Sequence, residues 1–180
     1  MNQYVRKQFS IPCTTIGTDF LTKEVNIDGS EVQLQIWDIA GIPKRYPSLY
    51  CNTKCCALVF DLTDPKSFES IDSRRTEFLN QLNPEDPDTF PFVLLWNKCD
   101  KVAERKVQVP EIKQYCETKS NMPYFETSAK DNTNVKAAFE EVAKLAFKRR
   151  SKEDEILIPK RVELIQTNQQ TQYKNWCGVF

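Results

Sequence analysis

The chain has 180 residues and a mass of 21.0 kDa, a size that fits one domain with a full hydrophobic core. Its 25 lysines and arginines balance 25 aspartates and glutamates, so the composition gives no sign of a surface that binds nucleic acid. Histidine is absent from the sequence, which excludes Ser-His-Asp triads, Cys-His dyads and histidine-based zinc sites within this chain.

Glycine and cysteine restrict the function further. The four glycines (Gly17, Gly29, Gly41 and Gly178) do not stand in either common glycine-rich pattern that cradles phosphate. The seven cysteines form no C-x-x-C pair, and several lie in apolar runs, which favours buried reduced thiols in a cytosolic protein over a disulfide framework. No apolar stretch approaches the ~20 residues of a membrane span, and the first residues do not resemble a secretory signal.

The strands expected first are of two kinds. Residues 20–27 and 32–37 alternate between apolar and polar side chains, and the turn-forming residues 28–30 between them predict an antiparallel hairpin. Residues 55–62 and 92–96 are continuous apolar runs, which is typical of strands covered on both faces.

Helices are expected between and after these buried strands. Apolar residues recur at helical spacing over residues 67–82, 109–119 and 134–149, and a short strand is expected at 124–127. Alternating strands and helices predict an α/β fold with a doubly wound, mostly parallel sheet. We therefore expect one domain over residues 1–150 and, because residues 151–180 are polar and lack periodicity, a flexible C-terminal tail.

Three segments follow predicted strands, where doubly wound sheets bind their ligands. The first segment is residues 37–41. Asp38 there suits a hydrated Mg²⁺, and Gly41 can offer a backbone N–H to phosphate, although an ordinary turn explains both residues equally well. The other two segments are residues 97–100 and 127–130. In the first of these, the acidic side chain of Asp100 can accept from both N–H groups on the Watson–Crick edge of guanine. In the second, a backbone N–H can donate to guanine O6. Together they predict a guanine pocket.

On residues 15–20, 37–41, 97–100 and 126–130, the chain resembles the Rab branch of Ras-like small GTPases and is similar to its late-endosomal subgroup. The resemblance covers about residues 1–148 and implies a Ras-like P-loop NTPase fold, with GTP or GDP and Mg²⁺ as ligands. It also implies effectors and regulators as partners, and vesicle traffic at endosomal and lysosomal membranes.

The resemblance assigns residues to three kinds of contact. Mg²⁺ would be held by Thr15 and Asp38. Nucleotide would be bound by Thr15, Gly41, Asn97, Lys98, Asp100, Ser128, Ala129 and Lys130. Effectors would be bound by Ile16, Phe20, Trp37 and Tyr50, although large aromatics on strands are as often core residues.

The sequence also departs from the family pattern at positions that bear on nucleotide binding and hydrolysis. Family members carry a strand and a phosphate loop ahead of a helix that ends much like residues 1–5, so the resemblance implies a chain that lacks both. The strands at 32–37 and 55–62 would then expose unpaired edges, which predicts a loose or self-associating protein. Ile42 stands where the family has a glutamine that orients the attacking water, so we assign no catalytic residue. A shortened form of a working GTPase and a degenerate homologue that binds effectors without nucleotide both remain open.

The last four residues begin with Cys177 and match the C-a-a-X pattern, which predicts a geranylgeranyl anchor. A chance terminal cysteine is the alternative, because Gly178 is not a typical residue of that pattern.

Overall fold

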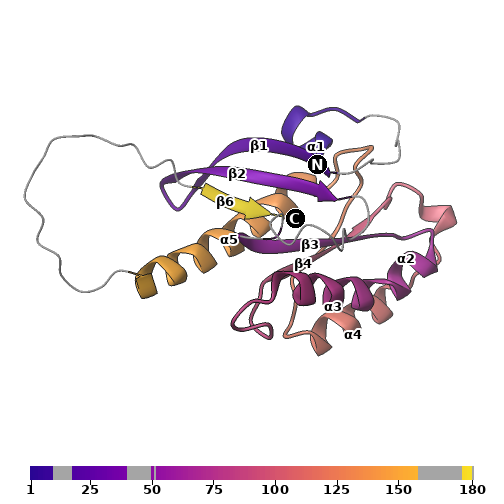
Figure 1. Cartoon of the computed structure of the whole chain (residues 1–180). Coiled ribbons are helices and arrows are strands. Elements are labelled where there is room, and N and C mark those ends of the chain that lie inside the picture. Colours follow the sequence, from indigo (N-terminus) through magenta and orange to yellow (C-terminus); the bar gives the residue numbers. More distant parts are fainter. Residues whose placement is uncertain (10–17, 40–49, 51, 158–175, 180) are drawn as a thin grey trace, which may run out of the picture.

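A computed structural model describes residues 1–9, 18–39, 50, 52–157 and 176–179, with side chains described as far as residue 150 (Figure 1). Its middle layer is a six-stranded sheet in the order β1-β2-β6-β3-β4-β5. The strands are β1 (Thr18–Ile27), β2 (Ser30–Ile39), β3 (Thr53–Asp61), β4 (Phe92–Asn97), β5 (Tyr124–Glu126) and β6 (Trp176–Val179). β1 pairs with β2 antiparallel, and every other neighbouring pair is parallel.

The predicted hairpin is confirmed. β1 and β2 join through Asp28 and Gly29, whose φ angles of 49° and 83° are the positive values that a tight hairpin turn requires. The register places Phe20 opposite Trp37.

Two hydrophobic cores lie on opposite faces of the sheet, because successive strand residues point to opposite sides. On β4, Val93 and Leu95 belong to one core, whereas Phe92, Leu94 and Trp96 belong to the other. The continuous apolar runs therefore have the two-sided burial that the sequence predicts.

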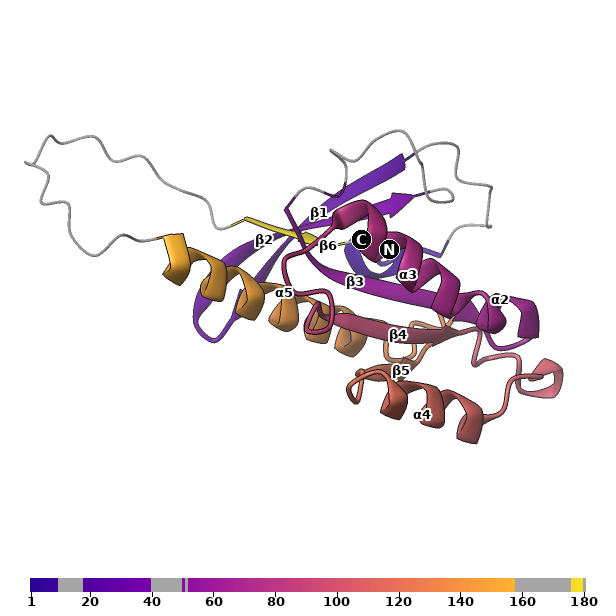
Figure 2. The same cartoon turned by 60° about the horizontal axis from the view of Figure 1, so that its bottom comes forward.

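The helices cover these two faces (Figure 2). They are α1 (Asn2–Arg6), α2 (Pro65–Glu69), α3 (Ile71–Leu82), α4 (Val109–Thr118) and α5 (Val135–Leu157), with a 3₁₀ turn at Val102–Glu104. α1 and α5 contribute to the first core, and α3 and α4 contribute to the second. The single helix expected over residues 67–82 is divided at Ser70, whose hydroxyl donates to the Ser67 carbonyl oxygen at 2.9 Å. Such local bonds from serine compete with a regular helix.

The first helix is held by contacts with β1 and α5. The Tyr4 ring stacks on Phe139 with centroids 4.6 Å apart. The Lys23 ammonium lies 3.7 Å from the centre of the Tyr4 ring and donates to the Tyr4 carbonyl oxygen at 2.6 Å. α1 is thereby fixed on the face of the sheet that α5 covers.

The C-terminal residues correct one expectation. β6 lies between β2 and β3 and pairs with both, so the expected open edges are wrong over the residues that β6 covers. α5 also continues past residue 150 to Leu157, whereas composition alone suggested a flexible tail from 151. The domain boundary near residue 150 stays a prediction.

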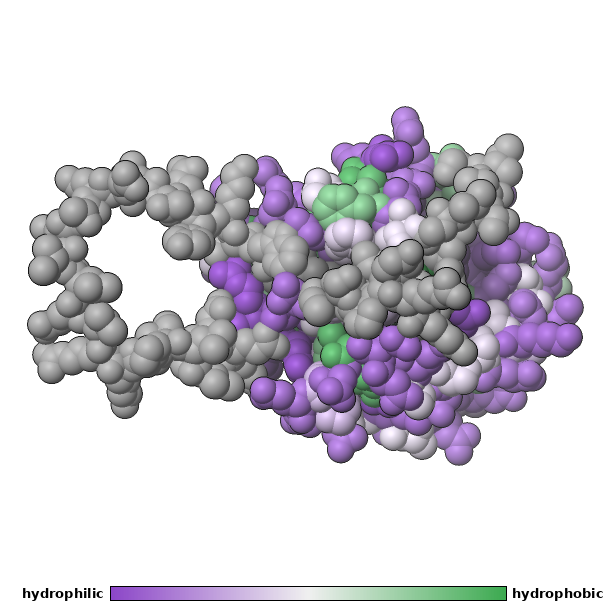
Figure 3. All heavy atoms as spheres, viewed as in Figure 1, coloured by the Kyte–Doolittle hydropathy of each residue, from purple (hydrophilic) through white to green (hydrophobic). Residues whose placement is uncertain are grey.

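On the face shown in Figure 3, the surface of the described residues is mostly hydrophilic, with small separate hydrophobic patches. No helix within the described part of the chain has the length and hydropathy to cross a bilayer. Of the cysteines whose side chains the structure describes, Cys55, Cys56 and Cys116 are buried and Cys99 is half-buried, and all four are free thiols. Burial raises the pKa of Cys116 to about 11, which keeps this thiol protonated and unreactive at neutral pH.

Candidate functional site

The first loop of the site leaves the carboxyl end of β4. Its backbone turns at Lys98, whose φ of 68° is in the left-handed region. The Asn97 carbonyl oxygen accepts from the backbone N–H of Leu62 at 3.1 Å, and the Cys99 N–H donates to the Thr127 carbonyl oxygen at 3.1 Å. The loop is therefore tied to its neighbours on both sides.

The second loop leaves the carboxyl end of β5. Thr127 and Ser128 are buried, with 5% and 0% of their surfaces exposed. The Thr127 N–H donates to the Trp96 carbonyl oxygen at 2.9 Å, and the Ser128 N–H donates to the Thr133 carbonyl oxygen at 3.1 Å. These bonds satisfy the buried backbone and fix the direction of the loop.

Side chains join the two loops directly. The Ala129 N–H donates to Asn97 Oδ1 at 3.0 Å, and Ser128 Oγ donates to Asp100 Oδ1 at 2.6 Å. The Asp131 N–H donates in turn to Ser128 Oγ at 3.0 Å, which orients the serine hydroxyl toward Asp100. The structure thus brings together Asn97, Asp100, Ser128 and Ala129, four of the residues expected to form the guanine pocket.

Electrostatics suit Asp100 to a hydrogen-bond acceptor. The hydrogen bond from Ser128 holds the pKa of the Asp100 carboxyl below its usual value, with a smaller contribution from the Lys130 charge. The carboxylate is therefore ionised at neutral pH and can accept from the two N–H donors of a guanine edge, a pattern that adenine does not present.

Lys98 is held by a residue that sequence reasoning missed. Its ammonium lies 2.6 Å from Asp61 Oδ2 at the end of β3, and Asp61 Oδ1 also accepts from the backbone N–H and the hydroxyl of Thr63, both at 2.8 Å. The signal that singled out Asp38, an aspartate at the end of a strand, could have found Asp61 as well. Lys130 has no described contact in this arrangement beyond its charge near Asp100.

Asp61 gives the site a testable pH dependence. Burial raises the pKa of its carboxyl, but hydrogen bonds from Lys98 and Thr63 outweigh burial, so the folded pKa lies below the usual value. The resulting stability is present above the unfolded pKa of about 3.9 and is lost as the pH falls through the folded value.

We expect Asp61→Asn to lower the free energy of unfolding at pH 7 by up to about 1 kcal/mol, as for a partly exposed ion pair. The difference between the variant and the parent should begin to shrink as the pH falls below about 4 and should vanish once the pH is below the folded pKa of Asp61. Urea unfolding between pH 7 and pH 3 measures both effects, with Glu69→Gln, an exposed acidic residue on α2, as the control. A difference that persists unchanged at low pH would contradict the assignment.

The phosphate and metal end of the site is only partly described. Thr15 and Gly41 lie outside the described residues, as does Ile42. Asp38 is exposed near the end of β2, where a carboxylate can serve as one ligand of a hydrated Mg²⁺. Within the described ranges, no group of three or more Cys, Asp or Glu side chains could hold a metal ion by itself. Asp38 thus fits the role of an outer contact to Mg²⁺ but not of a complete metal site.

The residues expected to bind effectors separate into two places. Phe20 is 40% exposed and its ring lies 4.6 Å, centre to centre, from that of half-buried Trp37. Tyr50 is only 2% exposed and packs edge-on against Phe78 in the second core, 5.7 Å between centroids. Ile16 lies outside the described residues. Among the residues expected to bind effectors, Phe20 and Trp37 therefore form one partly exposed aromatic pair, and Tyr50 is not part of it.

The expected lipidation residue, Cys177, lies within β6, where its backbone pairs with that of Leu34 on β2.

This arrangement, a sheet with β2, β3 and β4 ending at one edge and two loops joined by hydrogen bonds there, agrees with the comparisons. A profile of the Ras family matches residues 1–148. The chain belongs to the Ras family, and the Ras-like fold expected from its sequence is confirmed. Membership implies guanine nucleotide and Mg²⁺ as ligands, and effectors and regulators as partners, in general terms.

Individual relatives place the chain in the Rab branch. It is 49% identical to Ras-related protein Rab-7a of Paramecium octaurelia over 179 residues, which cover 97% of this chain and 86% of the relative. It is 50% identical to Ypt/Rab-type GTPase ypt7 of Schizosaccharomyces pombe over 161 residues, 86% of this chain and 78% of the relative. With Ras-related protein Rab7 of Cenchrus ciliaris, it shares 45% identity over 184 residues, 98% of this chain and 88% of the relative. The predicted similarity to the late-endosomal Rab subgroup is confirmed.

Proposed function

We propose that this chain is a Rab-type regulator of traffic at endosomal and lysosomal membranes, with a guanine pocket that selects the base and a weakened hold on phosphate. The observation that carries the proposal is the clamp between the two loops: Asn97 with Ala129, and Ser128 with Asp100. Such a clamp supports selective binding of a guanine base, because it orients the acceptors and donors before the ligand arrives.

Weak phosphate binding follows from the 180 residues as they stand. None of their four glycines stands in a G-x-x-x-x-G-K-[ST] pattern, whose backbone N–H groups and lysine hold the β- and γ-phosphates in P-loop proteins. Ile42, in place of a glutamine, has no group that could orient an attacking water. The enzymatic activity of this chain is therefore expected to be low or nil.

The base pocket can be tested with one substitution. Asparagine at position 100 offers one acceptor and one donor, whereas aspartate offers two acceptors. Asp100→Asn should therefore weaken binding of GMP by about tenfold to a hundredfold, the value of one charged hydrogen bond, and should favour xanthosine monophosphate instead. Titration calorimetry of both nucleotides, with AMP as a third ligand, measures the change.

Lys101→Ala is the matched control, because the Lys101 ammonium pairs with Glu104 at 2.8 Å outside the clamp. It should leave the order GMP over AMP unchanged. Equal binding of GMP and AMP by the parent chain would overturn the proposed pocket.

A second function is favoured by the sequence departures: an interaction module that binds effectors without nucleotide. The isoleucine at position 42 and the proline at position 43, both within the segment that resembles the family, favour it. The nucleotide content of protein purified from cells separates the two, since the module would carry none and still bind effectors.

Membrane attachment would come from the C-terminal Cys177. Transfer of a geranylgeranyl group would join Cys177 Sγ to the first prenyl carbon, and would release diphosphate together with the thiol proton. One prenyl chain binds membranes reversibly, so a second signal or partner would be needed for stable attachment. Mass spectrometry of the C-terminal peptide from cells should find the prenylated cysteine. An unmodified, full-length C-terminus would contradict the anchor.

A further inference from the structure

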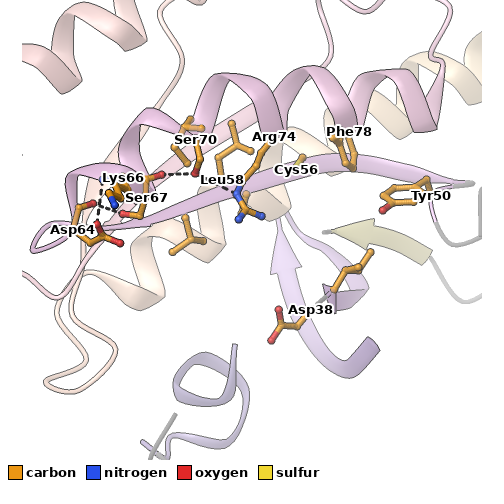
Figure 4. A pocket seen from close by; sticks show the side chains of 14 residues that line it. Asp38, Tyr50, Cys56, Leu58, Asp64, Lys66, Ser67, Ser70, Arg74 and Phe78 are labelled. Atoms are coloured by element: carbon orange, nitrogen blue, oxygen red, sulfur yellow. Dashed lines mark hydrogen bonds between the residues drawn. The ribbon is translucent and has the colours of Figure 1, made fainter. Parts of the chain in front are cut away.

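A cavity of about 390 Å³ lies at the β1 edge of the sheet, on the face that α1 and α5 cover. Its walls are residues 23–27 of β1, Tyr4 of α1 and the side of α5 between Lys136 and Lys144. It shares no described residue with the guanine pocket. A larger cavity, of about 540 Å³, has Asp38 on its wall and therefore adjoins the site already described (Figure 4). The smaller cavity has no part in the functions proposed so far.

Lysine side chains from three elements meet at this cavity. Lys23 belongs to β1, and Lys136 and Lys144 belong to α5. Lys7 follows α1 and lies close enough for its charge to act on Lys23. The 180 residues as a whole carry no net charge, so this concentration of positive charge is local. An excess of positive charge in a hollow of the surface attracts anions.

Among the described residues that border the cavity, one carboxylate faces these lysines. Glu140 lies one turn after Lys136 on α5, with 3.5 Å between the ammonium and the carboxylate. Glu24 also borders the cavity, but its side chain points to the other face of the sheet, because side chains alternate along a strand and its neighbours Lys23 and Val25 face α5. Four ammonium groups therefore meet one carboxylate on this side of the sheet.

Lys23 is held in place and still has hydrogens to donate. Its ammonium donates to the Tyr4 carbonyl oxygen at 2.6 Å and lies 3.7 Å from the centre of the Tyr4 ring. An ammonium has three donors, so the others can bond to a ligand. Burial is the largest cause that lowers the pKa of Lys23, and the charges of Lys7 and Lys136 lower it further, against an opposite effect of the Glu140 charge. The lysines thus repel one another, and a bound anion would relieve that repulsion.

We propose that this cavity binds a phosphate monoester carried on a polyol, as in an inositol phosphate, either free or as the headgroup of a lipid. A phosphate monoester carries a charge of about −1.5 to −2 at pH 7, which suits several ammonium groups opposed by one carboxylate. Lysine binds phosphate as a point charge, so several lysines can share one phosphate group. The side chain of Lys136 is 80% exposed, so the phosphate can reach it from solvent.

The rest of the cavity suits hydroxyl groups. A phosphate group fills only a small part of the 390 Å³. β1 is an edge strand that pairs with β2 alone among the described strands, so backbone N–H and C=O groups along its outer edge have no sheet partner there. These groups and the Glu140 carboxylate can bond to the hydroxyls of a polyol, whereas an apolar ligand would cover polar groups without bonding to them.

NMR on the full chain, without nucleotide, tests the site with inositol monophosphate as the probe. The amide signals of residues 23–27 and 136–144 should shift as the probe is added, and those of residues 97–100 and 127–130 should not. Unphosphorylated inositol should cause no shift. Binding of GMP is followed separately at residues 97–100 and 127–130, so failure of the guanine pocket and failure of this site are distinguishable.

One charge reversal measures the contribution of the lysines. Lys136→Glu should weaken binding of inositol monophosphate by roughly tenfold or more. The variant should fold, because the side chain of Lys136 is 80% exposed. Lys113→Glu, at an exposed lysine of α4, changes the net charge equally and should bind the probe as the parent does. Equal weakening by the two variants would show attraction to overall charge only, and would overturn the site.

Vesicles distinguish the two sources of the ligand. Binding to phosphatidylcholine vesicles that contain phosphatidylinositol monophosphate, and not to vesicles that contain phosphatidylserine at equal charge, would assign the site to a lipid headgroup. Binding of free inositol monophosphate without binding to either kind of vesicle would assign it to a soluble ligand. The proposal is overturned by equal binding to both kinds of vesicle, or by amides of residues 23–27 and 136–144 that do not respond to either form of the phosphate.

Discussion

The 180-residue chain should bind GTP, GDP and GMP with dissociation constants within about tenfold of one another, because the base contacts supply most of the affinity. In a P-loop protein, the added phosphates gain bonds from the loop amides, the lysine and Mg²⁺. Charged hydrogen bonds contribute roughly 1.5–3 kcal/mol each, so three of them account for at least three orders of magnitude. Asp38 alone does not replace them, since Mg²⁺ needs near-octahedral oxygen ligands that include the phosphates.

Calorimetry of the three nucleotides with Mg²⁺ measures this series. The control is the same chain with a strand and a glycine-rich phosphate loop grafted ahead of Met1, for which affinity should rise steeply from GMP to GTP. Hydrolysis by the grafted chain should remain slow until Ile42→Gln is added. Nanomolar binding of GTP by the ungrafted chain would show that another segment holds the phosphates, and would refute the expectation.

The features predicted best are those that a short stretch of the sequence encodes, such as the hairpin and the two loops of the site. The hairpin could be predicted because Asp28 and Gly29 tolerate positive φ and the flanking residues alternate. The meeting of the two loops could be predicted because each directly follows a strand, and the bonds from Ser128 to Asp100 and from Ala129 to Asn97 then confirm that the loops meet.

What the sequence could not predict depends on distant pairing. The residues of β6 are four, too few for a periodic signal, and their strand conformation depends on partners more than a hundred residues earlier in the chain. Strand preference depends strongly on such context. Asp61 ends a strand as Asp38 does, so its place could have been noticed, but its ion pair with Lys98 is a contact that only the fold creates.

The same limit applies to aromatic residues, since one aromatic side chain carries no sign of whether it faces the core or solvent. The resemblance to the Rab family assigns both Phe20 and Tyr50 to effector binding, yet Phe20 is 40% exposed and Tyr50 is 2% exposed. Their substitutions should therefore act on different properties of the protein.

Tyr50→Ala should lower the free energy of unfolding by about 3–5 kcal/mol, because it removes a buried ring that packs against Phe78 and leaves a cavity. That loss is a large part of a typical total of about 5–15 kcal/mol. Phe20→Ala should change stability by less than about 1 kcal/mol, but should weaken effector binding by about thirtyfold if Phe20 is an interface anchor worth about 2 kcal/mol.

Urea unfolding and surface plasmon resonance against a Rab-binding domain separate the two effects. Tyr50→Phe, which keeps the ring, is the matched control and should retain most of the stability of the parent. Loss of effector binding by Tyr50→Phe at unchanged stability would return Tyr50 to the effector surface. Because the ring of Tyr50 is covered by the second core and the ring of Phe20 lies open beside Trp37, we expect binding to depend on the pair Phe20 and Trp37.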